Sequence, residues 1–310
     1  MNFNPAVRRT LLSFAIGAIA VGSGGSASST PAAEVTTTVT AVGKKGAAPP
    51  ALKKEDVQPF LNKERMQGSD WRHADDLALA ILIDDSIDTQ AASQWNDLRA
   101  FIESQSPNTL VAVAYARNGA AMIAQDFTNE HAQAAKALRI PLSTGGAFSS
   151  PYLSLQDWLK RWPDNGPKRR SLILISSGVD FFRGSFEPVD PDVDTVIELA
   201  QKANVNLWTI YYPTGAHFGR RFYPTFYAQG NLSRLAEQTG AETFYLGFNE
   251  PVTLKPYFDE IRDHLNNQYL LTFQSNEGGK KGKLERFRVM SEVPNVEFFT
   301  FTQVFLPPSQ

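Results

Sequence analysis

The 310-residue chain contains no cysteine, and this absence excludes several kinds of site at once. Without thiols there is no disulfide framework and no cysteine nucleophile. Histidine is also scarce, and the four histidines are scattered without ligand spacing, so a zinc site is not expected. The net charge of -2 lacks the basic excess that phosphate binding requires, which argues against a nucleic-acid partner.

Familiar catalytic patterns are missing as well. Ser176-Ser177-Gly178 does not follow the GxSxG pattern of a serine nucleophile, and neither standard glycine-rich phosphate loop occurs. Asp84 and Asp85 are adjacent, and neighbouring side chains of a strand point to opposite faces, which argues against a shared acid and base. The sequence therefore favours a protein that is not an enzyme.

The residues that are present describe an exported protein with a substantial core. A hydrophobic content of 42% is enough for one main domain with small additions. Residues 1–33 have the layout of a signal peptide, because Arg8 and Arg9 precede an apolar stretch, Leu11 to Val21, that is short for a membrane span. We expect export to the periplasm or beyond. An uncleaved N-terminal membrane anchor remains the alternative.

The stretch Leu77 to Thr89, LALAILIDDSIDT, carries the most information. Its unbroken apolar run is typical of a strand buried on both faces, and it ends abruptly in oxygen-bearing side chains. Open α/β sheets place their sites at the C-terminal ends of such strands. Carboxylate and hydroxyl oxygens suit Mg²⁺, so Asp84, Ser86 and Asp88 form a candidate cation site.

Strand-like and helix-like segments alternate from this point onward. Alternation predicts a doubly wound, mainly parallel sheet of the α/β class, and the hairpin signal Asn118-Gly119 predicts an antiparallel edge strand, Ala120 to Phe127. The other expected strands are Leu77 to Asp84, Thr109 to Arg117, Ser171 to Ser176, Val205 to Tyr212 and Thr243 to Leu246. The expected helices are Gln90 to Ser106, Glu130 to Leu138, Leu153 to Trp162, Val193 to Ala203, Asn231 to Thr239 and Leu254 to Asn267.

Strand-like segments also flank this region. Val35 to Val42 precedes it, and the segments Tyr269 to Gln274, Leu284 to Met290 and Val296 to Phe305 follow it, separated by glycine and proline turns. We therefore expect a β appendage and linker over 34–74, the α/β domain over 75–267 and a C-terminal β appendage over 268–310.

Several motifs of the chain, taken together, resemble those of a known protein family. They are the ILIDDS strand end, the Gly145-Gly146 loop, the strand entering Ser176-Ser177-Gly178, and the NVNLWTIYY and LAEQTGAETFYLG segments. In this order they resemble a von Willebrand factor A (VWFA) domain. The KKEDV and NNQYLLTF segments narrow the resemblance to a VWFA-related family of exported proteins first grouped from acidobacteria. The resemblance implies a Rossmann-like fold and protein binding.

The family's metal-ion-dependent adhesion site combines a DxSxS loop, a threonine and an aspartate. Here Asp88 replaces the last serine of the first loop. Ala147 stands where the threonine is expected, and Ser177 stands where the aspartate is expected, with Asp180 three residues later. Two ligands are thus lost, so we expect Mg²⁺ binding to be weak or absent. The candidate metal residues are Asp84, Ser86, Asp88 and Asp180.

Aromatic and arginine side chains gather in two segments that are expected to emerge on the same face. Such residues are favoured anchors of protein interfaces. The candidate partner-binding residues are Arg220, Arg221, Phe222, Tyr223 and Tyr227, together with Phe181 and Phe182. The alternative is that these aromatics pack on their own loops.

The sequence therefore predicts an exported, non-enzymatic, adhesion-type protein that engages a protein or peptide through the strand-end face. Two alternatives remain open. One is a metal-assisted hydrolase that uses Asp84, Asp88 and Asp180. The other is a structural scaffold without a ligand site.

Overall fold

The computed structural model describes residues 33–44, 47–144, 148–182, 190–214, 222–244, 251–275 and 279–308, and the side chains of 222–224 are not described. The expected signal peptide lies outside these ranges except for its last residue. Among the helices that are described, none has the length and apolar character needed to cross a membrane.

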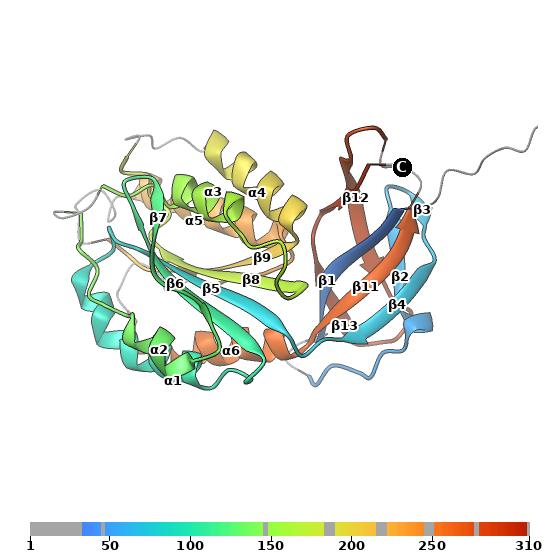
Figure 1. Cartoon of the computed structure of the whole chain (residues 1–310), viewed down its shortest axis with the longest axis horizontal. Helices are drawn as coiled ribbons and strands as arrows, with labels where there is room; N and C mark the ends of the chain where they lie inside the picture. The colour runs from blue at the N-terminus through green and yellow to red at the C-terminus, as the bar shows by residue number, and fades with distance from the viewer. Residues whose placement is uncertain are drawn as a thin grey trace, which may run out of the picture. The chain divides into compact units, whose positions relative to one another are not determined.

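A six-stranded sheet organises the α/β domain, in the order β10-β9-β8-β5-β6-β7 (Figure 1). Strand β5 lies in the interior and pairs in parallel with β6 and β8, while β7 is an edge strand antiparallel to β6, so both topology predictions are confirmed. The strands are β5 (Leu77–Asp84), β6 (Thr109–Arg117), β7 (Ala120–Thr128), β8 (Arg169–Ser176), β9 (Val205–Tyr211) and β10 (Thr243–Phe244).

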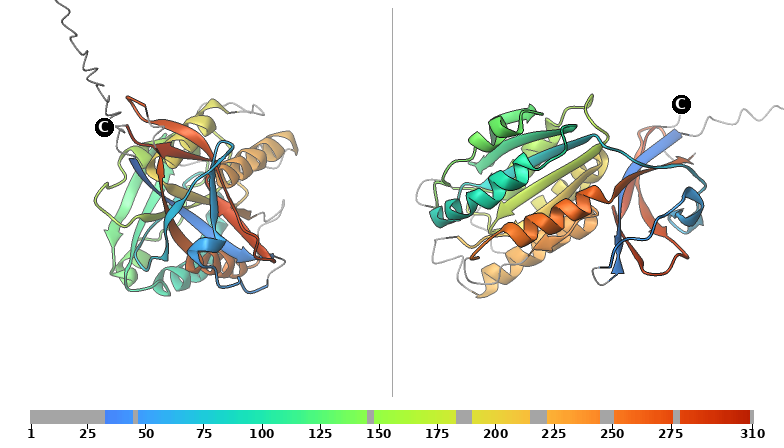
Figure 2. Two further views of the ribbon diagram at one scale, coloured as in Figure 1. Left: turned by 90° about the vertical axis from the view of Figure 1, so that its right-hand side faces the viewer. Right: turned by 90° about the horizontal axis from the view of Figure 1, so that it is seen from below.

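Helices cover both faces of this sheet, because the buried strands carry apolar side chains on both sides. In β5, Leu79 and Ile81 point into one core, and Ala80 and Leu82 point into the other. The first core receives α1 (Trp95–Glu103), α2 (His131–Lys136) and α6 (Lys255–Asn266), and the second receives α3 (Pro151–Lys160), α4 (Pro191–Ala203) and α5 (Phe222–Gln238). Figure 2 shows α1 and α6 side by side on the first face.

The strands that precede and follow the α/β domain pair with one another. They form two four-stranded sheets, β13-β1-β11-β4 and β14-β12-β2-β3, which share one apolar core. Phe273 and Phe287, one from each sheet, stack at 5.5 Å inside it. The strands are β1 (Ala33–Gly43), β2 (Gln58–Leu61), β3 (Glu64–Arg65), β4 (Gly68–His73), β11 (Gln268–Ser275), β12 (Lys283–Met290), β13 (Val296–Thr300) and β14 (Gln303–Leu306).

Buried polar contacts join this β layer to the α/β domain. Arg169 at the start of β8 donates to the carbonyl oxygen of Ala74, which follows β4, and to the side chain of Gln268 at the start of β11. Asn204, the left-handed residue that ends α4, accepts hydrogen bonds from Thr37 and from the backbone of Thr38. Because buried polar groups are costly without partners, these contacts fix the connection between the layers.

Three predicted elements differ from the structure. The helix expected from Asn231 begins at Phe222, so the segment to Tyr227 is helical and not a loop. Pro224 is tolerated because it lies in the first turn, and Gly230 weakens the helix without ending it. The strand expected over Val296 to Phe305 is divided into β13 and β14. The start of the helix expected from Gln90 is the 3-10 helix η3 (Thr89–Gln94).

Candidate functional site

The C-terminal ends of β5 and β8 meet at the point where the strand order reverses. Asp84 ends β5 and Ser176 ends β8, and the chain runs outward from this pair of strands in both directions. Open α/β sheets bind ligands outside such a switch point. Asp84 therefore lies on the face where a ligand is expected.

Hydrogen bonds surround the Asp84 carboxylate. Its Oδ1 accepts from the Ser86 backbone at 2.9 Å and from the Ser86 hydroxyl at 2.7 Å, and its Oδ2 accepts from the Ser176 hydroxyl at 2.6 Å. Burial raises the pKa of Asp84, and the hydrogen bonds from Ser176, Ser86 and Ser149 oppose that rise. Asp84, Ser86 and Ser176 are fully buried, so no substrate reaches them in this conformation.

Asp85 points away from Asp84 and forms a bidentate ion pair with Arg139. Both guanidinium-to-carboxylate distances are 2.7 Å. Arg139 also lies over the ring of Tyr115, 3.7 Å from its centroid. The hydrogen bond from Arg139 to Asp85 raises the arginine pKa. The backbone of Leu142 donates to the same carboxylate, so Asp85 anchors the loop that follows α2.

A second set of hydrogen bonds anchors the loop before α3. The Ser150 hydroxyl donates to Asp180 at 2.7 Å and accepts from the Leu153 backbone, as an N-cap residue does. The Ser149 carbonyl accepts from the backbones of Phe181 and Phe182. The loops after β8 and before α3 are therefore bound to each other.

The carboxylates among the predicted metal residues make separate contacts. Asp88 caps η3 by accepting from the Gln90 backbone, and Asp180 accepts from Ser150. Within the described ranges, Asp84, Asp88 and Asp180 do not bring three ligand atoms within 4.8 Å of one another. Ala147 lies outside the described residues. Mg²⁺ needs close, near-octahedral oxygen ligands, and these three carboxylates do not supply them together.

Four exposed apolar side chains project from these anchored loops, and we call them the apolar collar: Ile140, Leu142, Phe148 and Phe182. Phe148 is 64% exposed, Ile140 61% and Phe182 55%. Leu142 is bonded to Asp85, and Phe181 and Phe182 are bonded to Ser149, the neighbour of Phe148, so two sets of hydrogen bonds carry the collar. Phe181 is half-buried beside it.

The other predicted binding residues belong to the start of α5. Arg220 and Arg221 lie outside the described residues, as do the side chains of Phe222 and Tyr223. Tyr227 is half-buried and contacts the neighbouring ring of Phe226, which is exposed. Tyr211, which ends β9, is hydrogen-bonded to Thr225 and Gln229, so this part of α5 lies at the same end of the sheet.

Gly178 allows the loop after β8 to approach α5. Its φ is +67°, and a Cβ there would lie 2.9 Å from the Ala228 carbonyl oxygen and from Leu232. Only glycine combines this conformation with that approach at low cost. The Gly178 carbonyl also accepts from the Tyr152 hydroxyl at 2.6 Å, which fixes the loop on its other side.

The geometry can now be compared with known proteins. No protein-family model and no curated sequence matches the chain. Solved structures that are similar include an aerotolerance-related membrane protein from Bacteroides fragilis, at 10% identity over 61% of this chain and 98% of that one, with a TM-score of 0.45. A von Willebrand factor type A structure from Catenulispora acidiphila covers 89% of this chain and 74% of its own, at 12% identity and a TM-score of 0.43.

The SpRpn10 VWA domain is also similar, at 13% identity over 59% of this chain and 94% of its own, with a TM-score of 0.40. The α/β domain resembles a von Willebrand factor A domain. Likenesses this remote carry no information on the activity or partner of the VWFA-like domain.

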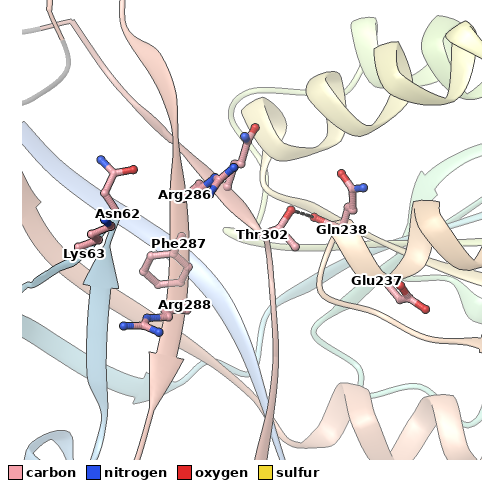
Figure 3. A pocket seen from close by; sticks show the side chains of 9 residues that line it. Asn62, Lys63, Glu237, Gln238, Arg286, Phe287, Arg288 and Thr302 are labelled. Carbon is pink, nitrogen blue, oxygen red and sulfur yellow. Dashed lines mark hydrogen bonds between the residues drawn. The ribbon is translucent and has the colours of Figure 1, made fainter.

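A cavity of about 610 Å³ lies away from the strand-end face, between β12 and the end of α5 (Figure 3). The Thr302 hydroxyl donates to the Gln238 carbonyl oxygen on one side of it. Arg286 and Arg288, both exposed, and Glu237 give it mixed charge. We assign no ligand to this cavity.

Arg139 and most of the collar were not identified from the sequence. Arg139 lies in an ordinary basic position after a short helix, and only the fold brings it to Asp85, 54 residues away. Ile140, Leu142 and Phe148 read as core or loop residues, because exposure is not visible in composition. One sequence feature did point to the collar. The two turn-rich segments around Pro141 and Gly145-Gly146 carry apolar residues and lie beside predicted site loops.

Proposed function

We propose that this chain is an exported, non-enzymatic protein that binds a protein or peptide partner through the apolar collar at the strand-end face. The observation that carries the proposal is the exposure of large apolar side chains on loops held by buried hydrogen bonds. Exposed apolar groups that share one face are typical of interaction sites. A scaffold with no ligand would bury these side chains within its own loops.

A rigid support favours binding, because little conformational freedom is then lost on association. Arg139 and Asp85 hold one side of the collar, and Ser149 holds the other. Phe148 and Phe182 supply aromatic anchors, which are enriched among the residues that dominate binding energies. We propose that Phe181, Arg220, Arg221, Phe222, Tyr223 and Tyr227 extend this surface toward the start of α5.

A hydrolase is less well supported by the same residues. Asp84 and Ser176 are inaccessible, and Asp180 is 2% exposed and bonded to Ser150. General acid-base catalysis requires a group within hydrogen-bond reach of the substrate. Partner binding without catalysis requires only the exposed collar, which is present.

We further propose that binding does not require Mg²⁺, because Asp84 and Ser86 are bonded to each other and Asp88 caps η3. Calorimetric titration of the full chain is expected to show no saturable binding at micromolar Mg²⁺. A stoichiometric isotherm that Asp84→Ala abolishes would contradict this proposal.

The partner can be trapped at the collar with a light-activated cross-linker. A benzophenone amino acid replaces Phe148 in one variant and Phe182 in another, and Met290, an exposed apolar residue on β12, provides the matched control position. Illumination of producing cells should yield the same cross-linked protein from both collar positions and not from Met290. Adding EDTA to the exported fraction should leave the yield unchanged. Equal products from all three positions would exclude a specific collar site.

A further inference from the structure

A group of potential metal ligands lies beside β10, the edge strand of the central sheet that is farthest from β7. Glu242, Glu260 and His264 each offer a ligand atom, and these atoms all lie within 4.8 Å of one another. Glu242 precedes β10, and Glu260 and His264 are one turn apart on α6. Residues at positions i and i+4 share a helix face, so the fold directs both toward Glu242.

His264 is the second, independent sign of a ligand. The residue is only 8% exposed, and its Nδ1 is buried without a hydrogen-bond partner. Its ring contacts those of Trp208 and Phe299, each with the ring centroids 5.2 Å apart, so its orientation is constrained. Buried polar atoms are rarely left unpaired, and the His264 ring offers one ligand atom within 4.8 Å of the two carboxylates.

The charges around His264 are unbalanced. A cavity of about 540 Å³ is lined by Glu242, Glu260, Asp263, His264 and Glu297, and no lysine or arginine is among its described lining residues. Burial raises the pKa of Glu242, and the charges of Glu260 and Glu297 raise it further. Like charges held this close without a cation repel each other, which a bound cation would relieve.

We propose that Glu242, Glu260 and His264 bind one divalent transition-metal ion, for which Zn²⁺ is the best fit. Two carboxylates with one imidazole match the oxygen and nitrogen ligands that zinc accepts, whereas Mg²⁺ and Ca²⁺ take oxygen ligands. Three protein ligands leave a position for water. Glu297, on strand β13, lines the same cavity as Glu242 and adds negative charge beside the site.

The site requires only a small adjustment. Ligand atoms around a tetrahedral zinc ion are ~3.4 Å apart, given bonds of about 2.1 Å, so the side chains must close by roughly an ångström. Glu260 is exposed and can move, while the buried His264 remains in place. The ion would then link α6 and the entry to β10 beside β13, which gives it a structural role that is independent of the collar.

The test is titration of the full chain with ZnCl₂ after treatment with EDTA and removal of the chelator. Calorimetry should show one saturable site, and Glu242→Gln and Glu260→Gln should each weaken it at least tenfold. Glu103→Gln, an exposed glutamate at the end of α1, is the matched control and should bind as the wild type does. Because binding favours the folded state, Tm should rise by about 5 °C or more at a hundredfold excess over Kd.

Co²⁺ provides a readout of the imidazole that does not depend on stability. Bound Co²⁺ should give a visible absorption band that Zn²⁺ displaces and excess Mg²⁺ does not, and His264→Gln should abolish it. If His264→Gln does not fold, the two glutamate variants decide the question. Absence of saturable Zn²⁺ binding, or equal affinity in Glu260→Gln and wild type, would overturn the proposal.

Discussion

The Ser176 hydroxyl donates to Asp84 across the switch point of the sheet, over 2.6 Å and 92 residues of sequence. Ser176 also accepts a hydrogen bond from the Gly178 backbone at 2.9 Å. One hydroxyl therefore ties the end of β5, the end of β8 and the loop after β8 together. The loops that carry the collar are anchored to this buried point.

Replacing Ser176 by alanine should destabilise the fold by about 2 kcal/mol, because a buried carboxylate loses a donor and the Gly178 amide loses its acceptor. Urea unfolding at neutral pH measures the change. Ser177→Ala is the matched control: its hydroxyl accepts one long bond, 3.3 Å, from Val179, and we expect a loss below ~1 kcal/mol. Equal losses in both variants would show that the Ser176 link has no special role.

Arg139→Met should cost about 3 kcal/mol, since it leaves the fully buried Asp85 carboxylate without its cation. The exposed pair of Lys202 and Glu198 provides the comparison, and Lys202→Met should change stability by less than ~0.5 kcal/mol. Thermal and urea unfolding of both variants check the difference. A small effect at Arg139 would mean that water replaces it at Asp85, and the collar loop would then lack the proposed anchor.

Much of the α/β architecture could be predicted because its strands are buried on both faces. Leu77 to Asp84 reads as a continuous apolar run that few other structures produce. The beginning of α5 could not be predicted, because Pro224 and Gly230 are common in turns and only tertiary contacts make this segment helical. Gly178 is one such contact, through its close approach to Ala228 and Leu232.

Some residues of the candidate sites could likewise be predicted from the sequence, and others could not. Asp84 and Ser86 were found because they follow directly on a recognisable strand. The Glu260–His264 pair could not be recognised from the spacing of the histidines, because its other member is a glutamate one helical turn away. Glu242 joins the pair only in three dimensions. Side-chain exposure, which defines the collar at Phe148 and Phe182, is likewise a property of the fold.

Two glycine-to-alanine substitutions should have opposite signs. Gly178→Ala should destabilise by about 2 kcal/mol or more, since φ is +67° and the new methyl group meets the Ala228 carbonyl. Gly230→Ala, in the interior of α5 with open space around it, should stabilise by about 0.5–1 kcal/mol. Unfolding midpoints measured side by side test both, and a stabilised Gly178→Ala would contradict the described loop.

Truncation of the collar should separate binding from stability. Phe148→Ala and Phe182→Ala remove exposed side chains that contribute little to the core, so each should leave Tm within a few degrees of the wild type. Each should weaken capture of the cross-linked partner by about 2 kcal/mol, which is roughly 30-fold in Kd. Met290→Ala removes another exposed apolar side chain, on β12, and should affect neither quantity. Unchanged affinity in both phenylalanine variants would place the partner elsewhere, because anchors at the centre of an interface cannot be removed without cost. A large fall in Tm would instead identify these rings as part of the folded loops, and the scaffold interpretation would then be favoured.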